Sequence, residues 1–243
     1  MGQIAGGIIF IGMIKLKHIL NEDEVEDNFG KVAFGEDPRI AKMQGRAVKQ
    51  MKDFTGREEN TPYERELLDI LSSWINQSSD KTADVLYSKF SLLKQAAKVF
   101  PQILLPETPN GTLVYRGLLF SNQKLLDMIH KTKKEDWEIG ETIKNYTMFR
   151  YVNPITYTPH RPVQSWSTDS KLVTSFFYDS GMLLSTKQTD EFLFNQNLMK
   201  YLFNKSNVSG GKDEREILHF GKNFKEDVYL SITEKLWLSL FAK

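Results

Sequence analysis

The chain has no cysteine among its 243 residues. This absence excludes disulfide bonds, thiolate metal sites and cysteine nucleophiles. Histidine is also scarce, and no two of the four histidines stand at metal-ligand spacing; they are His18, His130, His160 and His219. We therefore expect no metal site and no chemistry that depends on a thiol.

A strong net charge is also missing, because 32 Lys and Arg residues balance 31 Asp and Glu residues. A near-neutral chain without a long basic run gives no electrostatic support for a nucleic-acid partner. The apolar run from Ile8 to Met13 is too short to span a bilayer. Lys15 and Lys17 follow this run, whereas a signal peptide places its basic residues before the apolar run. We expect no membrane contact, and a cytoplasmic rather than a secreted protein.

The sequence pattern changes near residue 110 from mostly helical to alternating strands and turns. The two parts together predict an α+β protein. Residues 1–110 are mostly helical in pattern, and residues 111–243 alternate short strands with turns and helices. In the first part, Thr61-Pro62 is a typical helix start. The apolar face of the helix predicted after it includes Leu71 and Trp74. A second helix is predicted over Lys81–Phe100, followed by a proline-rich linker. The two parts form either two domains or one integrated domain.

The second part begins with a predicted strand at Thr112–Tyr115, which ends at Arg116-Gly117. A helix is expected near Ser121–Lys131. Three further strands are expected near the C-terminus, at Glu216–Phe220, Asp227–Ile232 and Leu236–Phe241.

Three short segments carry the candidate chemistry. They are Tyr115-Arg116-Gly117 at a strand end, Ser165 to Asp169 before a helix, and Glu214-Arg215-Glu216 at the start of a strand. Taken singly, each has an ordinary structural interpretation as a surface ion pair, a helix cap or a solvated strand edge. Their order along the chain and their local contexts together favour a functional role.

In this combination the segments resemble the Arg–Ser-Thr-Ser–Glu-x-Glu class of mono-ADP-ribosyltransferases. That class includes bacterial toxins that modify actin and Rho, and tailed-phage enzymes that modify host proteins. The resemblance covers Leu113 to Phe241. It implies a mixed, largely antiparallel two-sheet ADP-ribosyltransferase core, on which the helical N-terminal part packs.

The resemblance assigns roles residue by residue. Arg116 matches the strand-end arginine that binds a phosphate or ribose of NAD, and Ser167 matches the first serine, which orients Glu216. Glu214 and Glu216 match the paired glutamates. The remaining candidates for contact with NAD flank these positions: Tyr115, Gly117, Trp166, Thr168 and Phe176. Among them, Trp166 and Phe176 are candidates for an apolar wall against nicotinamide. The sequence departs from the class at Asp169, which stands where a serine is expected and can cap the following helix.

The chemistry fits these residue types. Cleavage of the nicotinamide–ribose bond develops positive charge on the sugar, which the carboxylate of Glu216 can stabilise. Alternate residues of a strand share a face, so we expect Glu214 to lie beside Glu216 and to engage the acceptor. The resemblance implies that Glu-x-Glu members modify arginine.

We therefore predict an enzyme that transfers ADP-ribose from NAD to an accessible arginine of a target protein. Two alternatives stay open, namely an NAD glycohydrolase that uses water as acceptor, and a non-catalytic NAD- or protein-binding module of the same fold. The expected setting is the cytoplasm, and specifically the host cytoplasm for a phage-encoded modifier.

Overall fold

A computed structural model describes residues 49–50, 69–75, 79–119, 123–177, 180–195, 198 and 215–242. The chain divides into two compact units, residues 1–49 and residues 50–243. The second unit holds both helices and the sheet, so it extends across the predicted boundary at residue 110. The predicted helix start at Thr61-Pro62 lies outside the described residues, and residues 69–75 are helical.

The helical segment 69–75 is followed by three further short helices before the sheet, α4 (Asp80–Ser88), α5 (Phe90–Ala96) and α6 (Pro101–Leu104). The prediction of one helix over Lys81–Phe100 was wrong. The backbone leaves the helical conformation at Lys89, whose N–H turns back to the carbonyls of Leu86 and Tyr87. The expected linker also contains a helix, because Pro101 occupies a first-turn position where its missing N–H costs nothing.

Eight strands form an antiparallel sheet in the order β2-β3-β8-β5-β1-β4-β7-β6. Their bounds are β1 Leu113–Leu119, β2 Trp137–Ile143, β3 Tyr146–Tyr151, β4 Val163–Ser167, β5 Gly181–Lys187, β6 Phe192–Leu193, β7 Glu216–Phe220 and β8 Tyr229–Thr233. Every strand pair in this order is antiparallel. The protein is therefore α+β, as predicted, with an antiparallel rather than a mixed sheet.

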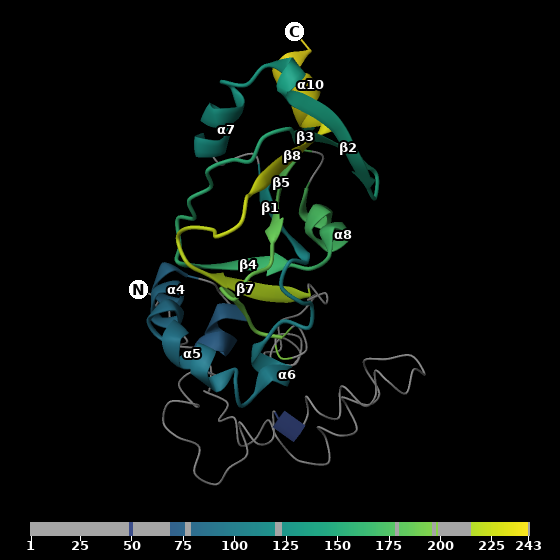
Figure 1. The fold of residues 1–243 in the computed structure, drawn as a ribbon. Helices are drawn as coiled ribbons and strands as arrows, with labels where there is room; N and C mark the ends of the chain where they lie inside the picture. The colour runs from purple at the N-terminus through teal and green to yellow at the C-terminus, as the bar shows by residue number, and fades with distance from the viewer. Residues whose placement is uncertain are drawn as a thin grey trace, which may run out of the picture. The chain divides into compact units, whose positions relative to one another are not determined.

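The sheet is weakest where β1 meets β4. Those two strands pair only at Tyr115 and Ser167, whereas β1 pairs with β5 along its whole length. Figure 1 shows β4 and β7 running across the direction of β1, β5 and β8. The division into two sheets stays a prediction, since all eight strands belong to one order.

Among the described residues, further helices are α7 (Gln123–Ile129), α8 (Ser170–Val173) and α10 (Glu234–Phe241), with the 3₁₀ turns η2 (Lys134–Asp136) and η3 (Thr174–Phe176). The helix expected near Ser121–Lys131 is confirmed over the span of α7. The strand predicted at Leu236–Phe241 was wrong. Leu236 and Trp237 are buried there while Leu238 is exposed, which is helical spacing rather than alternation.

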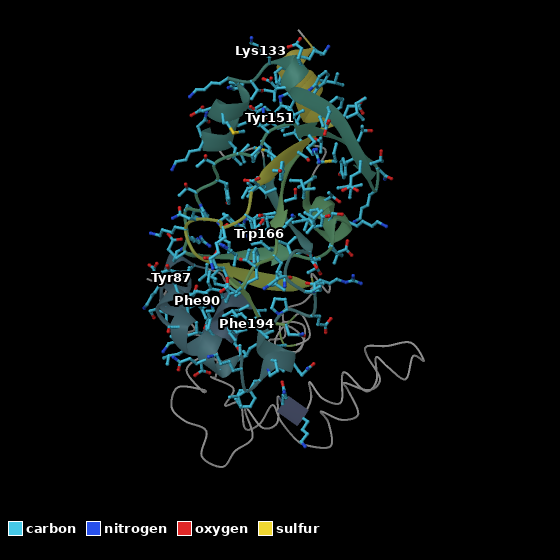
Figure 2. All side chains as sticks on the ribbon, viewed as in Figure 1. Tyr87, Phe90, Lys133, Tyr151, Trp166 and Phe194 are labelled. Carbon is cyan, nitrogen blue, oxygen red and sulfur yellow. The ribbon has the colours of Figure 1, made fainter. Side chains whose placement is uncertain are left out.

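Apolar side chains cover both sides of the sheet. A large cluster joins Trp166, Leu184 and Ile232 to α7 and α10, and a smaller one joins Val173 and Phe177 to Met148 and Leu183. Trp166 lies near the junction of β1 and β4 in Figure 2. None of the described helices is long and apolar enough to cross a membrane.

Candidate functional site

Glu216 lies at the junction of β1, β4 and β7. It is the first residue of β7, and its backbone pairs with Ser167 of β4. The hydroxyl of Ser165 donates a hydrogen bond to Oε1 of Glu216, which is half-buried. The carboxylate is therefore held against β4 by a neighbouring strand.

A second donor reaches the same oxygen from the helical segment 69–75. The indole Nε1 of Trp74 lies 3.3 Å from Oε1 of Glu216, and Trp74 is 4% exposed. The sequence pattern placed Trp74 on an apolar helix face but gave no sign of this contact. No local spacing could have revealed it, because 142 residues separate the two.

Arg116 brings a buried positive charge to the same place. Its Nη1 donates to the carbonyl oxygen of Ser165 at 2.5 Å, and its guanidinium bonds the side chain of Tyr157. Burial lowers the pKa of Arg116, while Tyr157 and then Glu216 act in the opposite direction. Arginine nevertheless stays charged in proteins. Its buried Nε has no hydrogen-bond partner among the described residues.

Ser165 bonds the carboxylate of Glu216. The resemblance assigned this role to Ser167, whose part in orienting Glu216 stays a prediction. Ser167 is buried, pairs with Glu216 in the strand register, and accepts the N–H of Asp169 at 3.1 Å. Strand alternation puts Ser165 and Ser167 on one face of β4. This alternation was the signal that could have identified Ser165.

Asp169 caps helix α8, as predicted. Its carboxylate accepts the N–H of Lys171 at 2.9 Å and lies 3.7 Å from Nη1 of Arg215. Arg215 has a left-handed backbone (φ 46°), and β7 begins only after it. Arg215 therefore does not belong to the strand, and the expected placement of Glu214 beside Glu216 stays a prediction. Glu214 itself lies outside the described residues.

Tyr115 and Gly117 lie on the face of β1 opposite to that of Arg116. Tyr115 stands across from Ser167, and burial, followed by the charges of Glu141 and Asp169, raises the pKa of its phenol. At Gly117, an added Cβ would lie 2.8 Å from Cγ1 of Val173, so the missing side chain makes room for α8.

Three candidates remain, and they are Trp166, Thr168 and Phe176. Trp166 is buried in the large core, edge-on to Phe192 and Phe224. Thr168 follows β4 and is half-buried. Phe176 belongs to η3, and its side chain lies outside the described part of the chain.

The junction thus joins a carboxylate, two hydroxyls, an indole N–H and a buried guanidinium. In this set the carboxylate can stabilise positive charge, and the guanidinium, on the face of β1 opposite to Tyr115, is a group that binds anions. Within the described residues, no group of three or more acidic or histidine side chains could hold a metal ion. No protein-family model, curated protein or solved structure matches the chain.

Proposed function

We propose that this protein cleaves NAD at the nicotinamide–ribose bond and transfers the ADP-ribose to an arginine of a target protein. The observation that carries the proposal is the contact series Arg116–Ser165–Glu216 at the β1–β4–β7 junction. The three sequence segments that carry the resemblance lie far apart in the chain, and residues from each of them meet there.

In the proposed reaction the C1′–N bond breaks and nicotinamide leaves as a neutral molecule with the bonding electron pair. The ribose then carries oxocarbenium-like positive charge, which the carboxylate of Glu216 stabilises. A nitrogen of the acceptor guanidinium forms the new bond to C1′ and releases a proton. Arg116 supports this proposal as a buried cation suited to the phosphates of NAD.

The arginine acceptor rests on the sequence pattern Glu214-Arg215-Glu216. A second carboxylate would orient the acceptor guanidinium by charge-assisted hydrogen bonds. The same junction without such an acceptor would hydrolyse NAD, and the same fold without turnover would only bind it.

The test incubates the protein with labelled NAD and a cell lysate, and compares Glu216→Gln, Glu214→Gln and Glu226→Gln. Glu226 is an exposed residue before β8, so the last variant controls for loss of one negative charge. We expect labelled protein with the wild type and with Glu226→Gln, and none with Glu216→Gln. We expect Glu214→Gln to release nicotinamide without labelling protein.

The other outcomes separate the alternatives. Nicotinamide release without labelled protein, in wild type and Glu214→Gln alike, would identify a glycohydrolase. Binding of NAD without either product would identify a non-catalytic module. An adduct on protein that hydroxylamine does not cleave would contradict arginine as the acceptor.

A further inference from the structure

Oxygen Oε1 of Glu216 receives two neutral donors from different parts of the fold. The Ser165 hydroxyl comes from β4, inside the sheet, and the Trp74 indole comes from the helical segment 69–75. Two donors on one carboxylate oxygen restrict both the rotamer of the side chain and the rotation of the carboxylate. Such restriction is what a reacting group requires, since small displacements are costly in rate.

The helices that follow segment 69–75 are attached to the strands β4 and β7. Asp80, at the start of α4, lies 2.5 Å from Nε of Arg161, just before β4. Phe90 of α5 stacks on Phe220 of β7 with ring centroids 5.0 Å apart. Figure 2 shows Phe90 beside this part of the sheet. Both contacts lie at the end of the β4–β7 pair where Val163 faces Phe220, so α4 and α5 are fixed to the two strands that carry Ser165 and Glu216.

We infer that Trp74 is a positioning residue for Glu216, which makes the helical segment 69–75 a functional part of the active site. The inference rests on the proposed function, in which Glu216 acts on the ribose of NAD. The indole N–H holds Oε1, and it also favours the charged form of the carboxylate, because a donor stabilises the anion more than the acid.

The test replaces Trp74 by Phe, which keeps an aromatic ring and removes the N–H. The matched control is Trp237→Phe on α10, because the buried Nε1 of Trp237 has no hydrogen-bond partner among the described residues. We expect Trp74→Phe to lower kcat for nicotinamide release by about 10-fold, as for loss of one hydrogen bond to a charged group, with KM for NAD nearly unchanged. Trp74→Phe should also move the acid limb of the pH–rate profile to higher pH. Trp237→Phe should change neither kcat nor the pH–rate profile.

A second measurement does not need activity. In a ¹H–¹⁵N spectrum of the wild type, the indole resonance of Trp74, assigned with Trp74→Phe, moves upfield in Glu216→Gln because the acceptor loses its charge. The indole N–H of Trp137 donates a hydrogen bond to Oγ1 of Thr132 at 2.9 Å. Because its acceptor is not Glu216, its resonance should not move and serves as the internal control.

The outcomes separate this inference from the proposed function. Lack of NAD cleavage by the wild type would overturn the proposed function, and the indole spectrum would still decide whether Trp74 holds Glu216. If the wild type cleaves NAD and Trp74→Phe matches Trp237→Phe in kcat and pH profile, the positioning role is overturned and the proposed function stands. An unmoved Trp74 resonance in Glu216→Gln would also overturn the inference.

Discussion

Among single residues, Ser165 connects the two charged groups of the candidate site. Its carbonyl accepts from Arg116 and its hydroxyl donates to Glu216, so one residue fixes a cation through the main chain and an anion through the side chain. Replacing its side chain should affect only the anion.

We predict that Ser165→Ala lowers the rate of nicotinamide release by about 10-fold to 100-fold, because the carboxylate of Glu216 loses one hydrogen bond. The main-chain contact to Arg116 is kept, so binding of NAD should change little. Steady-state kinetics beside Ser88→Ala, an exposed serine on α4, measure this effect. Equal rates for both variants would show that Ser165 does not position Glu216.

The cap at Asp169 allows a prediction about stability. Asp169→Ala should lower the free energy of unfolding by about 1 kcal/mol, because the first turn of α8 loses its side-chain acceptor. Asp169→Ser should retain most of that stability, since a serine hydroxyl also caps. Urea denaturation of the three proteins compares them, and an unchanged Asp169→Ala would argue against the cap.

These residues also show which features of the site could be predicted from the sequence and which could not. The cap at Asp169 and the placement of Glu216 at the start of β7 follow from spacings of a few residues, and both were predicted. The contact of Trp74 with Glu216 arises only when segments 142 residues apart pack together. The left-handed backbone of Arg215 was also unforeseen, because such a conformation is uncommon for residues other than glycine.

Among the elements, α8 and η3 depend on glycines in the strands beneath them. The ring of Phe177 is 1% exposed and covers Gly181 of β5, where an added Cβ would overlap the ring. Val173 covers Gly117 of β1 in the same way. The two glycines let this short helical segment lie close to the sheet.

Gly181→Ala should therefore lower the free energy of unfolding by about 1–3 kcal/mol, the usual cost of overpacking a core. Adding Phe177→Leu to it should cost less than the sum of the two single changes, because the smaller side chain relieves the overlap. Thermal or urea unfolding of the four proteins gives the coupling. Additive effects would contradict the close contact.

The error at Leu236–Phe241 has an identifiable cause. Leu236, Leu238 and Leu240 alternate as in a strand, but Trp237 and Phe241 also pack against the core, and this complete set has helical spacing. Alternation in six residues cannot decide between the two periods. The sheet order and the single β1–β4 pair depend on contacts across the whole unit, which the sequence pattern could not supply.

At the scale of the whole molecule, His219 is an ionisable group enclosed in the core. It is fully buried, stacks on Phe224 at 4.0 Å, and burial lowers its pKa to about 3. Oε2 of Glu191 lies 3.6 Å from its Nε2, beyond hydrogen-bond distance. Lys225 lies 3.6 Å from Oε1 of Glu191 and 2.7 Å from Oδ1 of Asp190.

This burial predicts acid sensitivity. The unfolded chain protonates His219 near its ordinary pKa of 6.5, whereas the folded protein does so only near pH 3. The unfolded state therefore binds more protons between these values, and stability falls as pH drops through this window by up to about 1.4 kcal/mol per pH unit. His219→Phe should flatten the dependence, and His130→Phe, at an exposed position, should not. Parallel curves of unfolding free energy against pH for all three proteins would contradict this account.

The measurement that tests the central claim most directly is release of nicotinamide from NAD by the purified protein, compared with Glu216→Gln and Glu226→Gln at equal concentration. The account predicts release by the wild type and by Glu226→Gln at similar rates, and a loss of at least about 100-fold in Glu216→Gln, because the developing charge on the ribose loses its carboxylate. Release by Glu216→Gln at the wild-type rate, or no release by the folded wild type, would contradict it.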